Sequence, residues 1–385
     1  MDKTTFDLAT YMADGIRGFM SAAYRNVLTN PREARFVNRM RRVVEKSAHR
    51  RQDILESDGI AVPPFLIASI ATTCNLHCKG CYARSNGIAT DGDRSGANGS
   101  QGNNAAQQKS TLTPEQWRTI CSEAASLGVS FTLLAGGEPM MRRDIIEAVA
   151  SVKEMIFPVF TNGTLIGPSY IDLIKRNLNI IPVISIEGTA MGTDERRGKG
   201  VFERAMLSMD MLKREDLIFG ASVTVTTENR ELVTSPQFID SLREKRCRLL
   251  FFIEYVPTEK GTEHLALSEE QVASMELAVL QLRSAYSDII FFSFPGDEKE
   301  TGGCIASGRG FFHIGPDGSA EPCPFSPFSD SNVLEIGVKG TLQSPLFRTL
   351  RDASILGWAH TGGCTLYEHQ DEVEAMLNKL KNNQI

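Results

Sequence analysis

The stretch Thr-Cys-Asn-Leu-His-Cys-Lys-Gly-Cys-Tyr, residues 73–82, carries three cysteines on one short segment. It directly follows residues 65–72, Phe-Leu-Ile-Ala-Ser-Ile-Ala-Thr, which we expect to form a buried strand. Thiolates are soft ligands that suit iron–sulfur clusters and zinc, and three of them on one loop can reach a single metal centre. A closed structural site needs four protein ligands, so three thiolates leave one position open for chemistry at the metal.

Strands and helices alternate along the chain after this loop. Five further strands are expected, each followed by a helical segment, at residues 129–135, 157–161, 180–186, 217–226 and 249–256. Such alternation implies parallel strands that are joined by right-handed crossovers. Six strand–helix units predict an α/β fold with a partial (β/α)6 barrel of the TIM type rather than a closed eight-stranded barrel.

Glycine and polar residues stand where the expected strands end. In parallel α/β barrels the functional site lies at the carboxyl ends of the strands. Gly136, Gly137 and Glu138 follow the second strand, and paired glycines let the backbone approach a ligand closely. Ser185 and Glu187 end the fourth strand and project on the same face, because they are two residues apart. We expect these residues to join the cysteine loop at one edge of the sheet.

The Cys-x3-Cys-x2-Cys spacing, followed by an aromatic residue, resembles the radical S-adenosylmethionine (SAM) superfamily. The resemblance implies that Cys74, Cys78 and Cys81 bind three irons of a [4Fe–4S] cluster, and that the fourth iron takes the amino and carboxylate groups of SAM. It implies further that reduction of the cluster cleaves SAM to a 5′-deoxyadenosyl radical. A zinc site with His77 as fourth ligand is the alternative. His77 directly precedes Cys78, however, and this position is poorly suited to tetrahedral coordination together with all three thiolates.

The resemblance, which covers about residues 65–260, also implies a set of SAM contacts. Glu138 would bind the SAM ammonium, Ser185 and Glu187 the ribose hydroxyls, and Arg197 the carboxylate, since a guanidinium binds carboxylates in bidentate fashion. Arg196 is the alternative to Arg197, and Thr224 the alternative to Ser222 on the fifth strand. The full set of expected cofactor-binding residues is Tyr82, Gly136, Gly137, Glu138, Ser185, Glu187, Arg197 and Ser222, with Tyr82 placed near the adenine.

A second cysteine group, Cys304, Cys323 and Cys364, surrounds the sequence Pro316-Asp317-Gly318. Such a turn folds two short strands together and so brings distant cysteines near each other. The pattern resembles the SPASM and Twitch extensions, and implies one auxiliary [4Fe–4S] cluster on these three cysteines. Its fourth site would be open, or filled by substrate or by a non-cysteine residue. Zinc, or a disulfide between two of these thiols, are the alternatives.

Four segments follow from these patterns. Residues 1–62 are expected to form a helical segment that packs on the main body, and residues 63–260 the barrel. Residues 85–112 are poor in large apolar side chains and predict a flexible insertion in the barrel, with a lid over the site as the alternative. Residues 261–300 would form a connecting helix region, and residues 301–385 a small cysteine-rich, Twitch-like domain that ends in a helix.

Composition narrows the class of protein. The net charge of −6 argues against nucleic acid as the main partner. We find no signal peptide at the start of the sequence, and no stretch with the roughly 20 apolar residues of a membrane-spanning helix. We therefore expect a cytoplasmic protein without a membrane partner. Eight cysteines are too few for a disulfide scaffold, and Cys121 and Cys247, which stand alone, are expected to be buried.

These features together predict an oxidoreductase or maturase-type radical SAM enzyme. Its radical would abstract hydrogen from a substrate that the sequence does not identify, whether a peptide, a protein or a tetrapyrrole-like compound. The auxiliary cluster would accept an electron or ligate the substrate, and a ferredoxin or flavodoxin would supply the reducing electron. The alternatives are a non-catalytic scaffold that binds zinc or a cluster, and an electron carrier.

Overall fold

The computed structural model describes residues 31–91, 111–357 and 364–382. Its centre is a nine-stranded sheet with the order β11-β10-β1-β4-β5-β6-β7-β8-β9, in which every neighbouring pair is parallel except β10 and β11. The main strands are β1 (Phe65–Ala71), β4 (Phe131–Gly136), β5 (Phe157–Thr161), β6 (Ile180–Ile186), β7 (Gly220–Val225), β8 (Leu249–Glu254) and β9 (Ile290–Phe294). The six predicted strands of the partial barrel are confirmed. A seventh parallel strand, β9, lies in the region expected to be helical only.

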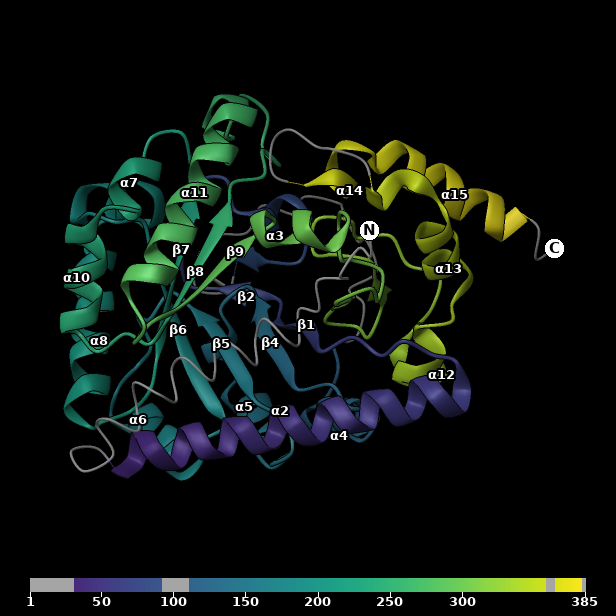
Figure 1. The fold of residues 1–385 in the computed structure, drawn as a ribbon, viewed down its shortest axis with the longest axis horizontal. Coiled ribbons are helices and arrows are strands. Elements are labelled where there is room, and N and C mark those ends of the chain that lie inside the picture. Colours follow the sequence, from purple (N-terminus) through teal and green to yellow (C-terminus); the bar gives the residue numbers. More distant parts are fainter. Residues whose placement is uncertain (1–30, 92–110, 358–363, 383–385) are drawn as a thin grey trace, which may run out of the picture.

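Helices cover the outer face of this curved sheet (Figure 1). Those that follow strands, or precede β4, are α4 (Pro114–Leu127), α5 (Arg143–Val149), α6 (Pro168–Arg176), α7 (Ala190–Arg197), α8 (Val201–Arg214), α9 (Arg230–Val233), α10 (Pro236–Glu244) and α11 (Glu269–Ala285). Capping boxes begin α4 at Thr113 and α11 at Ser268. Within the described residues, no helix combines the length and apolar character that a membrane crossing requires.

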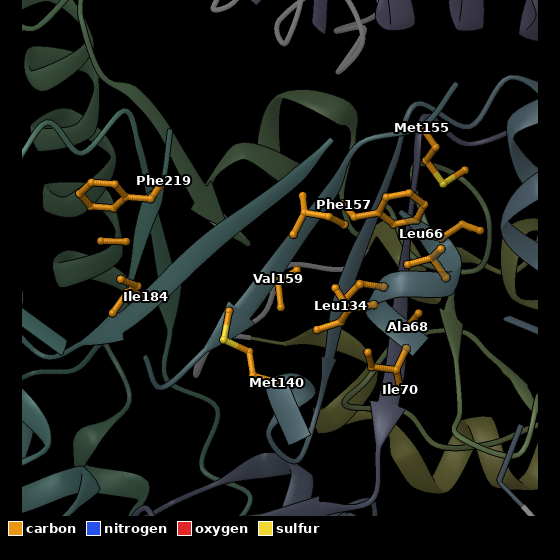
Figure 2. Packing of buried hydrophobic residues seen from close by; sticks show 14 of the residues in the cluster. Leu66, Ala68, Ile70, Leu134, Met140, Met155, Phe157, Val159, Ile184 and Phe219 are labelled. Atoms are coloured by element: carbon orange, nitrogen blue, oxygen red, sulfur yellow. The ribbon is translucent and has the colours of Figure 1, made fainter. Parts of the chain in front are cut away.

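Alternating residues of the strands build the core beneath these helices. Figure 2 shows Leu66, Ala68 and Ile70 of β1 in one apolar layer with Leu134 of β4 and Val159 of β5. This spacing of two follows from the pleat of a strand, which sends successive side chains to opposite faces. The intervening residues of each strand therefore face the inside of the partial barrel.

Helix α2 (Pro31–Asp58) closes the amino end of the barrel (Figure 1). Phe36 and Met40 of α2 pack with Phe65 and Phe131, the first residues of β1 and β4. An apolar cavity at this end is lined by Met40 and mostly by residues near the strand starts, among them Phe65, Phe131, Pro158, Ile181, Leu249 and Ile290. We therefore look for polar functional residues at the opposite, carboxyl end of the strands. The helix expected at residues 6–29 lies outside the described residues.

The carboxyl-terminal region extends the same sheet. Strand β10 (His313–Ile314) pairs in parallel with β1, and β11 (Ala320–Glu321) returns antiparallel to β10. The predicted turn at residues 316–318 joins the two strands. After this hairpin come α12 (Val333–Thr341), α13 (Pro345–Asp352), α14 (Thr365–Glu368) and α15 (Gln370–Asn382). The second cysteine group is thus built onto the edge of the barrel sheet next to β1.

Residues 82–91 are packed rather than loose. Helix α3 (Tyr82–Ser85) follows the cysteine loop, and β3 (Thr90–Asp91) pairs with β2 (Thr73–Cys74). Ile88 and Ala89 are buried against Ala83. The first residues of the expected insertion, 85–91, therefore pack against the end of the cysteine loop, with Cys81 and Tyr82 lying against this apolar cluster. Residues 92–110 of the expected insertion lie outside the described residues.

A series of buried hydrogen bonds connects the β10–β11 hairpin to strand β1 of the barrel. His313 Nε2 lies 2.8 Å from Ser69 Oγ of β1, and His313 Nδ1 lies 2.7 Å from Glu321 Oε2 of β11. The Ser319 hydroxyl donates to Glu321 Oε1 at 3.0 Å. All four side chains are buried, so each depends on its protein partners for hydrogen bonds.

We expect His313→Ala to lower the free energy of unfolding by about 3 kcal/mol, because it leaves the Ser69 hydroxyl and the Glu321 carboxylate buried without their partner. Urea unfolding followed by circular dichroism measures this loss. His264→Ala is the matched control, since His264 is exposed, and should change stability by no more than about 0.5 kcal/mol. Equal stability of the two variants would contradict a stabilising role for these buried hydrogen bonds.

Candidate functional site

The three cysteines of the first group lie on one loop at the carboxyl end of β1. Each is half-buried and unbridged by a disulfide. The pKa of the Cys74 thiol is raised to about 11, chiefly by burial and further by Glu138, Cys78 and Cys81. The thiols are therefore close enough to repel one another's negative charge, as ligands of one multinuclear centre must be. Among the described residues, no group of three or more His, Cys, Asp or Glu side chains has the arrangement of a single-ion site.

Backbone contacts from distant parts of the barrel fix this loop. Lys79 N–H donates to the Arg196 carbonyl at 2.8 Å, at the end of α7. Gly80 N–H donates to Glu259 Oε2 at 3.0 Å, after β8. These two contacts hold the loop from both sides of the barrel mouth, and within the segment the Arg84 guanidinium donates to the Leu76 carbonyl at 2.8 Å.

Gly136 and Gly137 press against the chain that leads into the loop. A Cβ on Gly136, whose φ is 118°, would lie 2.5 Å from the Ala71 carbonyl oxygen. A Cβ on Gly137 would overlap the carbonyl oxygen of Thr73. Gly137 N–H and Glu138 N–H donate to the carbonyls of Ala71 and Thr73 at 2.7 and 2.8 Å. The glycines were expected to allow close approach of a ligand, and the structure gives a second reason: they allow close approach of the cysteine loop's own backbone.

Glu138 is buried, and its carboxylate accepts three hydrogen bonds. Oε1 accepts from Met140 N–H at 2.9 Å and from the Thr161 hydroxyl at 2.7 Å, and Oε2 accepts from Asn162 N–H at 2.8 Å. Burial raises the pKa of this carboxyl, and these three donors oppose the shift. The side chain predicted to bind an ammonium group is therefore rigidly held between β4 and β5.

The Thr161-Asn162-Gly163 turn, which is not among the expected site residues, also contributes to the site. Asn162 Nδ2 donates to Asn75 Oδ1 of the cysteine loop at 2.9 Å, and Asn75 Nδ2 donates to the Thr164 hydroxyl at 2.8 Å. A turn signal with hydroxyl and amide side chains directly after β5 was the available clue. Its side chains connect Glu138 to the loop that carries the thiols.

Glu187 and the two arginines at the end of α7 form a buried ion cluster. Glu187 Oε1 lies 2.7 Å from Arg196 Nη1 and 2.7 Å from Arg197 Nη2, and Oε2 accepts from Thr224 N–H at 3.2 Å. Glu187 was expected to face a ribose and Arg197 a carboxylate, but in this structure they bind each other. Burial raises the pKa of the Cys78 thiol, and the charges of Arg197 and Arg196 oppose this shift. The arginines therefore stand beside a thiol of the loop.

The remaining predicted residues lie near these groups. Ser185 and Ser222 are register partners on β6 and β7, and their hydroxyls are 3.0 Å apart. Tyr82 was expected near an adenine; its ring lies 5.1 Å from the ring of Phe325, in the carboxyl-terminal region. The two lone cysteines, Cys121 and Cys247, are fully buried elsewhere in the core, as predicted.

The second cysteine group gathers in the apolar interior beside β11. Cys304, Cys323 and Cys364 are all buried, and the thiols of Cys323 and Cys364 are in hydrogen-bond contact. The pKa of Cys323 is raised well above its usual value by that contact and by burial, and burial does the same for Cys304. No disulfide joins them. The three cysteines, which are distant in sequence, therefore lie near one another, as the turn at residues 316–318 predicts.

The two cysteine groups adjoin each other through Tyr82. Its phenol lies close enough to Cys81 and Cys323 for the charge of either thiolate to raise its pKa. Asn86 Nδ2 donates to the Pro324 carbonyl at 2.8 Å. The segment after the first group therefore packs directly on the segment that carries the second.

Comparison with known proteins identifies the barrel. Residues 68–234 match the family model described as the Radical SAM superfamily. The AdoMet-dependent heme synthase of Methanosarcina barkeri is 26% identical over 336 residues, which cover 80% of this chain and 89% of that protein. The PqqA peptide cyclase of Rhizobium meliloti is 23% identical over 341 residues, covering 85% and 81%.

A solved structure shares the fold. SuiB of Streptococcus suis bound to S-adenosylmethionine matches this chain with a TM-score of 0.60 at 17% identity, over 80% of this chain and 72% of that one. The prediction of an α/β partial barrel with a parallel sheet is thereby confirmed.

We expect Gly137→Ala to abolish iron binding by the first cysteine group, because the added methyl group would force the Thr73 carbonyl and Cys74 away. After anaerobic reconstitution, iron analysis should show a loss of about four irons per chain relative to the parent. Gly167→Ala is the matched control, since nothing lies within 4 Å of a Cβ at that position. Full iron content in Gly137→Ala would contradict the constraint described for this glycine.

Proposed function

The chain is a member of the radical SAM superfamily, and from this premise we propose that Cys74, Cys78 and Cys81 hold the [4Fe–4S] cluster of a radical SAM enzyme with one auxiliary cluster. The observation that carries the proposal is the convergence of three half-buried thiols with two arginines and a rigidly held glutamate at the carboxyl end of the strands. Three thiolates leave one iron without a protein ligand, which suits binding of a small cofactor.

Cys74, Cys78 and Cys81 would hold the cluster, which would supply the electron for reductive cleavage of SAM and so the radical chemistry of hydrogen abstraction. The protein's part is to bind and orient the reactants and to exclude water. Helix α2 and the apolar residues at the strand starts close one end of the barrel, so the substrate must enter at the other end. The contacts of Asn75, Lys79 and Gly80 keep the thiols in place while it does so.

The buried ion cluster supports a role for the arginines in binding the carboxylate of SAM. Glu187 carries one negative charge against the two positive charges of Arg196 and Arg197. One positive charge is therefore left for an anionic ligand, and the fork of a guanidinium suits a carboxylate. Ser185 and Ser222 offer hydroxyls on adjacent strands for the ribose, and Glu138 a carboxylate for the ammonium.

We assign the auxiliary cluster to Cys304, Cys323 and Cys364. Burial of three thiols in one apolar interior, with two in direct contact, supports this assignment. Such a centre would accept the electron that remains on a substrate after hydrogen abstraction. The packing of Tyr82 on Phe325 places the two cysteine groups on adjoining segments, which suits electron transfer between the reaction site and this centre.

The relatives point to two substrate classes. The Methanosarcina barkeri relative is a heme synthase, and the Rhizobium meliloti relative is a peptide cyclase. We propose a tetrapyrrole as the first substrate to test, because the heme synthase aligns over the larger share of its own length. A ribosomal peptide is the second candidate, and the peptide cyclase supports it. A ferredoxin or flavodoxin would supply the electron.

We expect Cys78→Ala to lower 5′-deoxyadenosine formation at least about a hundred-fold, because the cofactor supplies the hard chemistry and the loss of one thiolate removes it. The assay is anaerobic, with dithionite and SAM, and uses chromatography of the nucleoside product. Cys121→Ala is the control, since Cys121 is buried far from both groups in sequence and packs in the helical core. If the reconstituted parent released no deoxyadenosine, the proposed reaction would be wrong.

Iron coproporphyrin III, the tetrapyrrole for which a second Methanosarcina barkeri relative, an Fe-coproporphyrin III synthase, is named, is the probe. Adding it should raise the rate of deoxyadenosine formation by about ten-fold over SAM alone, since a bound substrate consumes the radical productively. Mass spectrometry of the porphyrin should then show a product of changed mass that forms only when SAM and reductant are both present. A peptide library tested in parallel gives the other outcome: stimulation by a peptide and none by the porphyrin would overturn the tetrapyrrole assignment.

A further inference from the structure

We infer that the carboxylate of Glu298 is the fourth protein ligand of the auxiliary cluster, beside Cys304, Cys323 and Cys364. The inference rests on the proposed auxiliary centre and adds to it the identity of the residue that completes it. Three thiolates on a four-iron cluster leave one iron to be ligated by something else. The question is therefore which other side chain reaches the buried group.

Glu298 reaches it from a segment that no cysteine motif marks. The residue lies in the short helix η3 (Gly296–Thr301), directly after β9, the strand that the sequence analysis did not predict. Its side chain is buried, as are the three cysteines. The Glu298 carboxylate accepts a hydrogen bond from the Cys304 thiol. A carboxylate in contact with one thiol of the group is placed to share its metal centre.

The backbone around Glu298 and Cys304 holds this pair in place. Gly303 N–H donates to the Glu298 carbonyl at 3.3 Å, which curls the chain between the two residues. Ile305 N–H donates to the Glu298 carboxylate. Cys304 N–H donates to the Leu356 carbonyl at 2.7 Å, and a Cβ on Gly303 would overlap that same carbonyl. The pair is therefore pressed against the segment that leads toward Cys364.

The four side chains arrive from four separate elements. Glu298 follows β9, Cys304 follows the turn at Gly303, Cys323 ends the hairpin, and Cys364 begins α14. Contact between Glu298 and Cys304, and between Cys323 and Cys364, links them in two pairs. The charges of Cys364 and Cys304 act on each other, so the pairs adjoin.

Charge explains why a carboxylate would be kept in this apolar interior. Burying an ionised carboxylate is costly unless it is paired or bound to metal. Glu298 is buried beside the Cys304 thiol. A cluster bound at the three thiols supplies iron, whose charge would stabilise the ionised form. Carboxylate oxygen is also a harder, more readily displaced ligand than thiolate, so the iron that it binds would be the one open to exchange.

The test uses the full chain with Cys74, Cys78 and Cys81 replaced by alanine, so that any iron reports on the second group. Reconstituted with 57Fe, this parent should hold about four irons per chain and show one iron with an oxygen ligand in its Mössbauer spectrum. Glu298→Gln should weaken the hold on that iron, so that mild oxidation gives the electron paramagnetic resonance signal of a [3Fe–4S] cluster. Glu298→Cys should keep about four irons and lose the oxygen-ligated component.

Glu335→Gln is the matched control, because Glu335 is an exposed carboxylate in the same region; it should match the parent. A Mössbauer spectrum that is unchanged in both Glu298→Gln and Glu298→Cys would overturn the assignment of Glu298 while leaving the auxiliary centre intact. A parent that binds zinc, or no metal, would overturn the auxiliary centre itself and this inference with it. Thermal unfolding of each variant separates loss of a ligand from loss of the fold, and the cysteine variant restores a ligand if glutamine proves unstable.

Discussion

The arrangement at the barrel mouth depends on one close approach between backbones. The chain leaving β1 and the chain leaving β4 lie so near each other that only hydrogen can occupy the inward position of Gly137. Two backbone hydrogen bonds, from Gly137 to Ala71 and from Glu138 to Thr73, bridge the gap. This contact sets where Cys74 begins the loop and where the Glu138 carboxylate lies. The position of the thiols relative to the cofactor-binding edge is therefore decided by packing of main chain rather than by side chains.

Much of this fold could be predicted from local sequence because its signals are local. Buried parallel strands read as apolar runs, and capping boxes at Thr113 and Ser268 mark helix starts within four residues. The thiols of the first group share one loop, so their convergence follows from spacing alone. Strand β9 was missed although Ile-Phe-Phe-Ser-Phe is apolar, because the helix before it and the polar turn after it favoured a connecting region.

The contacts that could not be predicted are those that depend on tertiary packing rather than on sequence spacing. The pairing of Glu187 with Arg196 and Arg197 depends on how α7 packs across the end of β6, and no spacing rule expresses this. The same holds for Glu298, whose relation to Cys304 depends on a curled backbone after an unexpected strand. A sequence motif identifies candidate functional residues, but only the tertiary fold shows which other residues contact and position them.

The strand β1 joins the two cysteine groups into one rigid unit. Ser69 of β1 is hydrogen-bonded to His313 of β10, which in turn is bonded to Glu321 of β11. Cys74 follows Ser69 by five residues, and Cys323 follows Glu321 by two. Because these three side chains are buried and their strands belong to one sheet, the starting points of both cysteine segments are fixed relative to each other. This polar bridge across neighbouring strands adds to the register that the buried apolar face of the sheet already specifies, and so keeps the two cysteine segments at a constant separation.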